Sequence, residues 1–247
     1  MKTVILSDIH GNLSALQAVI ADFECKYSVK SVILLGDLID YGMRSNEVIE
    51  TLRELESRLP IICNLCGNHE IAVLHSENHL ENFSSERGRV SLKYTMEHLT
   101  RESFEYIQTK METSGWKTLE CDGHPILAVH GDLKNPYWGK MEDEQLLLND
   151  YEIFDYVFSG HSHKPHLKEI YYKTGNLEMR NRKKTIFINP GSVGQPRNHN
   201  PLAQYVMVDG RTGTVHFNTV EYDIEAEQKL FTNEVDIFYR DRLSKGI

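Results

Sequence analysis

Three short apolar runs in the first part of the chain each end in a polar turn that contains glycine. They cover residues 4–6, 32–35 and 61–65. Continuous apolar character over so few residues predicts strands that are buried on both faces, although periodicity alone does not exclude a buried helical segment. Glycine at each run's end allows the backbone to turn sharply there.

Apolar residues at helical spacing follow the first two runs and predict two helices. Asn12 is a suitable N-cap for the first helix, and Pro60 ends the second. The apolar stripes consist of Leu13, Leu16, Val19, Ile20 and Phe23, and of Val48, Leu52, Leu55 and Leu59. Repeated strand, loop and helix units predict a parallel sheet whose functional loops gather at its carboxyl edge.

Residues 71–112 are more polar and are predicted to be a helical insertion. Helices over 86–96 and 101–111 would be joined near Thr100, a possible N-cap. Three roles stay open from the sequence: a cap over a functional site, a dimer surface, or a peripheral helix pair with neither role.

Beyond Gly115 the pattern changes to strands. Runs at 125–129, 156–158, 166–172, 177–188, 205–208 and 214–220 are predicted strands, and 146–148 lies in a short amphipathic stretch. Asp223 is expected to cap one final helix that carries Leu230, Phe231, Val235, Phe238 and Leu243. The chain shows no linker, internal repeat or low-complexity tract, so residues 1–247 are interpreted as one domain with two packed sheets and helices outside.

Charge and composition narrow the classes of function. The formal net charge is −9, which argues against nucleic acid as a partner. A local basic cluster at Arg180, Arg182, Lys183 and Lys184 is interpreted as a solvated hairpin. No run reaches the roughly 18 apolar residues of a membrane span, and the first residues have no secretory apolar region. The four cysteines are too few for a disulfide framework, so we expect a cytoplasmic protein.

Residues able to bind metal stand beside glycines at the predicted strand ends. A carboxylate such as Asp37 at the exit of a buried strand needs compensation for its lost hydration, and metal ions can provide it. Asp8 and His10 are two residues apart, as are His161 and His163, so each pair would point the same way in extended backbone. Asn68 and His130 complete the set at five such strand ends.

The order of these blocks resembles that of the calcineurin-like metallophosphoesterases. The blocks read DIHG at 8–11, GDLID at 36–40, GNHE at 67–70, HG at 130–131 and GHSH at 160–163. The tail NPGSVGQPR at 189–197 and the helix that starts at 223 are similar to the small prokaryotic branch of phosphodiesterases and diadenosine tetraphosphatases. The resemblance spans essentially the whole chain. It implies a four-layer α/β/β/α sandwich, with two mixed sheets flanked by helices.

The resemblance also implies a centre with two metal ions. Asp8, His10 and His163 would bind one ion, and Asn68, His130 and His161 would bind the other. Asp37 would bridge them. Mixed imidazole and carboxylate ligands suit manganese, iron, zinc or nickel, and manganese is favoured. Two such metal ions can activate a bridging hydroxide for in-line attack on phosphorus.

By the same resemblance, His69 is the general acid and Asp40 orients its ring; the alternative is that Asp40 only caps the turn. Glu70 is expected to brace the loop. Tyr41 stands where the protein-phosphatase branch has arginine, which argues against phosphoprotein substrates. Arg197 is therefore the candidate for binding phosphate, with Arg44 second, although either can be an ordinary surface arginine. Asn12 is a further substrate-binding candidate, although its N-cap role would also explain it.

The predicted activity is hydrolysis of a phosphodiester or a phosphoanhydride, as in a dinucleoside polyphosphate. The substrate would be small and phosphorylated, for example a nucleotide. The alternatives are a small-molecule phosphomonoesterase and a non-catalytic scaffold with the same fold. The pattern gives no indication of the oligomeric state.

Overall fold

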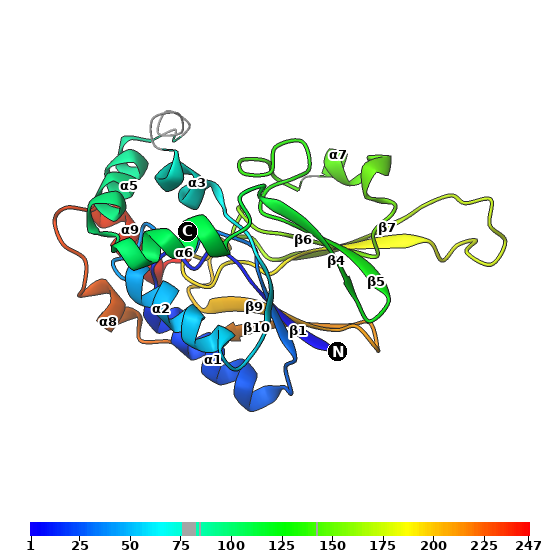
Figure 1. Ribbon diagram of the computed structural model, residues 1–247, viewed down its shortest axis with the longest axis horizontal. Coiled ribbons are helices and arrows are strands. Elements are labelled where there is room, and N and C mark those ends of the chain that lie inside the picture. The colour runs from blue at the N-terminus through cyan, green and yellow to red at the C-terminus, as the bar shows by residue number, and fades with distance from the viewer. Residues whose placement is uncertain (76–82, 84, 142) are drawn as a thin grey trace.

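Two five-stranded β-sheets pack face to face in the computed structural model, which describes residues 1–75, 83, 85–141 and 143–247 (Figure 1). The first sheet has the order β10-β9-β1-β2-β3 and consists of β1 (Lys2–Leu6), β2 (Ser31–Leu34), β3 (Ile61–Asn64), β9 (Ala203–Asp209) and β10 (Thr214–Val220). The second has the order β4-β5-β6-β8-β7 and consists of β4 (Trp116–Cys121), β5 (His124–Val129), β6 (Tyr156–Ser159), β7 (His166–Tyr171) and β8 (Lys184–Asn189).

Each sheet has a parallel centre and antiparallel outer strands. In the first sheet β1, β2 and β3 run parallel, and β9 and β10 are antiparallel additions. In the second, β5, β6 and β8 run parallel between β4 and β7. Both sheets are therefore mixed, as predicted. Because parallel strands end at the same edge, six loops that follow strands are available to build one site.

The first sheet is covered by helices on its outer face and by the second sheet on its inner face. Val4 and Leu6 of β1 pack outward against Leu16 and Phe23 of α1 (Leu13–Lys26). Ile5, between them, faces inward and packs in the core between the sheets. Burial on alternate sides explains why these strands appear in the sequence as uninterrupted apolar runs. The helices α2 (Ser45–Glu56) and α6 (Arg101–Lys110) contribute to the outer core.

The fourth layer, on the outer face of the second sheet, is thin. It consists of the short helix α7 (Asp143–Leu146) and a 3-10 turn, η2 (Asn149–Tyr151). Leu146 and Tyr151 pack there against Val157 and Phe187. The predicted arrangement of two mixed sheets flanked by helices is thus confirmed. None of the helices in the described part of the chain is long and apolar enough to span a membrane.

The predicted helical insertion is present in the part of 71–112 that the structure describes; residues 76–82 and 84 fall outside it. It contains the end of α3 (Asn68–Leu74), then α5 (Glu86–His98) and α6. Thr100 caps α6 as predicted, because its hydroxyl accepts the N–H of Ser103 at 3.2 Å. The sequence therefore identified both long helices to within two residues of their ends.

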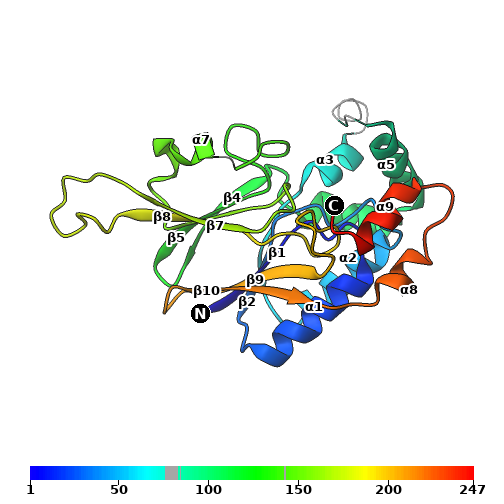
Figure 2. The same ribbon diagram turned by 180° about the vertical axis from the view of Figure 1, so that it is seen from behind.

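Two predictions for the second half of the chain were wrong. The strand predicted over 177–188 begins only at Lys184, because 177–183 form the turn of the long β7–β8 hairpin. The single final helix is two short ones, α8 (Ile224–Gln228) and α9 (Ile237–Asp241), followed by the 3-10 turn η3 (Arg242–Ser244). Asp223 caps α8 as expected, but Asp236 caps α9 with its own side chain. Figure 2 shows the loop between these two helices.

Candidate metal centre

The strand-end residues converge into two buried groups that share Asp37. Within each group the nitrogen and oxygen atoms able to bind metal lie within 4.8 Å of one another. One group consists of Asp8, His10, Asp37 and His163, and the other of Asp37, His130 and His161. Asn68 lies beside the second group: its Oδ1 is 2.9 Å from His161 Nδ1 and 3.1 Å from His130 Nε2. The structure thus brings together all seven residues predicted as ligands.

The backbone presents these side chains through left-handed turns. Positive φ angles occur at Asp8 (54°), His10 (49°), Asp37 (53°), His161 (61°) and His163 (57°). Such angles are uncommon for residues with a side chain and collect at functional sites. The expectation that each two-residue pair points the same way because its backbone is extended was therefore wrong. Hydrogen bonds from Asp8 N to Gly36 O and from His10 N to Asp37 O, both 3.0 Å, fix the first turn.

Two glycines let the loops after β2 and β3 touch. Gly36 has φ of +98°, and a Cβ there would lie 2.5 Å from the nitrogen of Gly67. A Cβ on Gly67 would collide with the carboxylate of Asp37. The glycines that flank Asp37 and Asn68 in the sequence are thus what allows these two side chains to lie in one cluster.

Glu70 holds the same two loops together from behind. Its buried carboxylate accepts the N–H groups of Gly67 at 2.8 Å, Asp37 at 2.9 Å, Leu38 at 2.7 Å and Ile39 at 3.2 Å. Burial and the nearby Asp37 raise the pKa of Glu70 to about 7, while the hydrogen bond from Gly67 favours the ionised form, whose hydrogen bonds are charge-assisted and strong. Glu70 therefore braces the loops, as the sequence suggested.

Replacing Glu70 with Gln is expected to lower the free energy of unfolding by about 2–4 kcal/mol, because the amide brings an NH₂ group against backbone donors. At this chain length the melting temperature should fall by about 4–16 °C. Calorimetry on Glu70→Gln and on Glu54→Gln, an exposed control on α2, checks the expectation. Equal melting temperatures for the two variants would mean that Glu70 does not brace the loops.

Three imidazoles are held by hydrogen bonds on the side away from the cluster. The Nδ1 atoms of His10, His130 and His163 lie 3.1, 2.7 and 2.6 Å from the carbonyl oxygens of Ile39, Leu35 and Gln195. Because a carbonyl only accepts, each Nδ1 must carry the proton, which leaves Nε2 of the neutral ring as a lone pair that faces inward. Metal-binding histidines in proteins are oriented in this way.

The inward-facing lone pairs lie close to one another and to carboxylates. His163 Nε2 is 3.2 Å from His10 Nε2 and 3.1 Å from Asp8 Oδ1, an oxygen that has no hydrogen-bond donor among the described residues. His130 Nε2 is 3.3 Å from Asp37 Oδ2. The lone pair of neutral His163 and the ionised Asp8 Oδ1 repel at such a distance unless a cation lies between them, and His130 beside Asp37 needs a proton or a metal ion in the same way. The donor set therefore fits divalent metal ions, and its nitrogen and oxygen composition suits transition metals.

Burial and charge set the protonation of the cluster. Burial and the neighbouring His69 hold the pKa of His10 well below its usual range, and burial with His130 lowers the pKa of His161 to about 3. Burial would raise the pKa of Asp37, but His130 and His69 outweigh it and hold that pKa well below normal. Burial would lower the pKa of His130, but Asp37 raises it to about 9. At neutral pH Asp37 is thus ionised, His10 and His161 are neutral, and His130 is protonated unless a metal ion takes the place of its Nε2 proton.

His69 and Asp40 form a hydrogen-bonded pair at the edge of the cluster. His69 Nδ1 lies 2.7 Å from Asp40 Oδ2. Burial alone would lower the pKa of His69, but Asp37 and Asp40 raise it, so the ring keeps its proton to higher pH. Asp40 also accepts the N–H of Tyr41 at 2.7 Å, so it caps the turn as well as contacting His69.

Helix α5 supports this pair from the insertion. The hydroxyls of Ser91 and Thr95 donate to Asp40 Oδ1 at 2.6 and 3.0 Å. The part of the insertion that the structure describes therefore contacts the site through Asp40, which argues against a purely peripheral role. Sequence reasoning missed Ser91 and Thr95; their spacing of four residues, which places both on one helix face, was the available signal.

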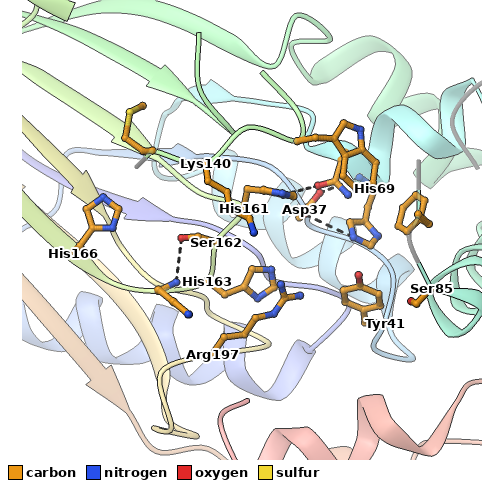
Figure 3. A pocket seen from close by; sticks show the side chains of 15 residues that line it. Asp37, Tyr41, His69, Ser85, Lys140, His161, Ser162, His163, His166 and Arg197 are labelled. Atoms are coloured by element: carbon orange, nitrogen blue, oxygen red, sulfur yellow. Dashed lines mark hydrogen bonds and ion pairs between the residues drawn. The ribbon is translucent and has the colours of Figure 1, made fainter. Parts of the chain in front are cut away.

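The cluster opens into a cleft of about 760 Å³ (Figure 3). Cluster residues that line it are Asp37, Asn68, His161 and His163, together with His69. The other described lining residues come mostly from loops of the second sheet and from around the insertion: Tyr41, Phe83, Ser85, Trp138, Lys140, Met141, Ser162, Lys164, His166 and Arg197. Of these, the sequence had singled out only Tyr41 and Arg197.

The three candidates for phosphate binding have different positions. Arg197 lines the cleft, and its buried Nε has no hydrogen-bond partner among the described residues. Arg44 instead forms an ion pair with buried Glu227 of α8 and donates to Ser14 at 2.7 Å. Asn12 is buried and does not line the cleft; its amide oxygen caps α1, and its nitrogen donates to Gly194 O at 3.0 Å. The polar atoms of Arg44 and Asn12 are thus engaged within the protein, and Arg197 is the candidate that lines the cleft.

Tyr41 fills the space beside the His69–Asp40 pair. Its ring centroid lies 4.5 Å from that of His69 and 4.6 Å from that of His10, and it stacks on Tyr239 of α9 at 4.3 Å. The position that holds arginine in the protein-phosphatase branch therefore holds an aromatic spacer here, packed between the C-terminal helix and the cluster.

Comparison with known proteins gives consistent results. Residues 1–213 match the model of the calcineurin-like phosphoesterase superfamily domain. The uncharacterized protein MJ0912 of Methanocaldococcus jannaschii is 31% identical over 98% of this chain and 97% of its own. The phosphodiesterase YfcE of Escherichia coli is 24% identical over 85% of this chain and 88% of its own. A metallophosphoesterase structure from Sphaerobacter thermophilus superimposes with a TM-score of 0.75 at 27% identity over the full length of both chains.

Proposed function

Because the chain belongs to the calcineurin-like phosphoesterase superfamily and is a phosphoric ester hydrolase, we propose that it cleaves a phosphodiester or phosphoanhydride bond of a small substrate with two bound metal ions. The observation that carries the proposal is that Asp37 belongs to both buried groups of metal-binding atoms. A carboxylate shared in this way can hold two ions close together.

The proposed ligands follow from these two groups. Asp8, His10 and His163 hold one ion, Asn68, His130 and His161 hold the other, and Asp37 bridges them. Manganese is our first choice, and iron, zinc or nickel suit the same donors. When bound, the two ions supply an activated water and positive charge that stabilises the phosphoryl oxygens.

The chain's own residues position the substrate and move one proton. The Arg197 guanidinium, unpaired through its Nε and facing the cleft, binds a phosphoryl oxygen. As the bond from phosphorus to the leaving oxygen breaks, His69 donates its Nε2 proton to that oxygen. Asp40 holds the His69 ring through Nδ1 and stabilises its charged form. The scaffold alternative gains no support, because the described site keeps the acid pair beside all seven ligand candidates.

The proposed substrates are small and phosphorylated. The net charge of −9 argues against a nucleic acid duplex, and a dinucleoside polyphosphate carries the kind of bond we propose. All four cysteines are free thiols, which is compatible with the reducing cytoplasm as the place of action.

Metal removal tests the proposal. The purified protein with manganese should hydrolyse bis(p-nitrophenyl) phosphate, and EDTA followed by dialysis should reduce the rate by at least about 10³-fold, since the ions contribute several kcal/mol of stabilisation. Added manganese should restore the rate. Activity that survives EDTA would contradict the metal-dependent mechanism. Cleavage of p-nitrophenyl phosphate but of neither the diester nor diadenosine tetraphosphate would identify a monoesterase instead.

A further inference from the structure

One arm of the cleft extends away from the acid pair. Figure 3 shows Ser162 and His166 on the side of His161 and His163 that lies opposite Tyr41 and Ser85. Lys140 and Lys164 also line the cleft, so the four residues Lys140, Ser162, Lys164 and His166 are here called the distal arm. No step of the proposed hydrolysis uses them.

The distal arm is positively charged in a chain that is negative as a whole. Among the described residues that line the cleft, Asp37 is the only carboxylate, and it belongs to the metal cluster. Neither Lys140 nor Lys164 lies within 4.0 Å of a carboxylate in the described ranges, which omit residue 142. Lys140 also borders a smaller hollow with Asp132 and Glu144, but it makes no ion pair with either. Its charge is therefore available to an anion in the cleft.

Two polar groups of the distal arm have unused hydrogen-bonding capacity. The Nε2 atom of His166 is buried and has no partner among the described residues. The hydroxyl oxygen of Ser162 accepts from Asn189 Nδ2 at 3.1 Å, which leaves its own proton free to donate. Buried polar atoms normally have a partner, and His166 is a residue of the cleft wall, so its unpartnered nitrogen is compatible with a ligand or a water molecule nearby.

The volume of the cleft is also larger than the volume that a single phosphate group would fill. Its volume of about 760 Å³ lies in the range of roughly 300–1,000 Å³ found for pockets that enclose whole small molecules. Arg197, beside His163, is well placed for the phosphoryl group at the metal cluster, and the distal arm offers separate cations.

We propose that the distal arm binds a second phosphate group of the substrate, other than the one that is hydrolysed. The inference rests on the proposed function and narrows the substrate class to nucleotide-sized phosphoesters or anhydrides with at least two phosphates. Lys140 and Lys164 supply the charge, Ser162 donates a hydrogen bond, and His166 forms part of the wall. A substrate with a single phosphate leaves the arm to water and binds more weakly.

Competitive inhibition of bis(p-nitrophenyl) phosphate hydrolysis tests the arm, because that reporter carries a single phosphate. Thymidine 5′-monophosphate is compared with thymidine 5′-diphosphate and thymidine 3′,5′-bisphosphate, which place the second phosphate differently. We expect at least one of the two-phosphate nucleotides to inhibit about 5- to 10-fold more tightly than the monophosphate. Lys140→Ala should remove most of this advantage and leave the KM of the reporter within about 2-fold.

Lys134→Ala is the matched control, since Lys134 is exposed on the same loop and does not line the cleft. It should keep the full advantage of the second phosphate. Equal inhibition by all three nucleotides would refute phosphate binding by the distal arm and leave the proposed hydrolase function standing. An equal loss of inhibition by all three nucleotides in Lys140→Ala would do the same. Absence of reporter hydrolysis in the manganese-loaded protein would overturn the proposed function and the arm with it.

Discussion

Replacing Asp37 with Asn is expected to remove both metal ions and to lower kcat/KM for a phosphodiester by at least about 10³-fold. Asp37 is the one residue present in both groups of metal-binding atoms, so its charge acts on both ions. The amide keeps the size of the carboxylate but removes the negative charge and one acceptor oxygen. Its remaining oxygen can still accept the N–H of His69, now 3.1 Å from Asp37 Oδ1. The loss should therefore appear in metal content more than in folding.

The measurement is metal content by mass spectrometry, taken beside activity on the same sample. Asp155→Asn is the control. Asp155 precedes β6, at the opposite end of that strand from His161, and its carboxylate lies 2.7 Å from His124 Nδ1, outside the cluster. The control should hold two ions per chain. An Asp37→Asn protein that also holds two ions would refute the bridging assignment.

Replacing His69 with Ala is expected to leave the metal content unchanged and to lower kcat by about 10²–10⁴-fold for poor leaving groups. His69 lines the cleft, and its Nδ1 is bound to Asp40, so its Nε2 is the atom that can protonate a leaving oxygen. A good leaving group needs no proton as it departs, so its rate should fall much less. Thymidine 5′-phenyl phosphate and thymidine 5′-(p-nitrophenyl) phosphate provide the matched pair of substrates.

Asp40→Asn extends this test. Asp40 acts through the imidazole, so once His69 is absent its replacement should cost little further activity, and the two effects should be strongly non-additive. Equal rate losses for the phenyl and p-nitrophenyl esters in His69→Ala would argue against the acid role. Additive losses in the double variant would argue that Asp40 does not work through His69.

The cluster of candidate metal ligands could be predicted from the sequence because the signals for it are local. Each strand end that carries candidate ligands also holds a glycine, as Gly36 stands beside Asp37. Parallel strands bring their carboxyl ends to one edge, so residues as far apart as Asp8 and His163 meet without any signal between them. The two buried groups in the structure are the physical result of that pattern.

What the sequence could not predict depends on contacts between distant segments. Asn12 and Arg44 were reasonable substrate-binding candidates by type, but Gly194 and Glu227 already occupy their polar atoms. The hydroxyl of Ser91 reaches Asp40 from 51 residues away. No local sequence pattern predicts such a contact, because a serine on an exposed helix face could have the same neighbours in the sequence.

The backbone conformation of the loops was the other feature that the sequence did not predict. Left-handed φ angles at residues such as His10 and His163 are imposed by the hydrogen bonds of the surrounding loops rather than by the residues themselves. The break between α8 and α9 has a similar origin. Asp236 caps a new helix, which brings Tyr239 onto the ring of Tyr41, and apolar spacing alone predicted one helix through this point.

Crystals of the manganese-loaded protein, measured at the manganese absorption edge, test the central claim most directly. The account predicts two anomalous peaks about 3.5–4 Å apart, with Asp37 in contact with both. One peak is expected beside Asp8, His10 and His163, and the other beside Asn68, His130 and His161. A single peak in an active protein, or peaks that Asp37 does not contact, would contradict it.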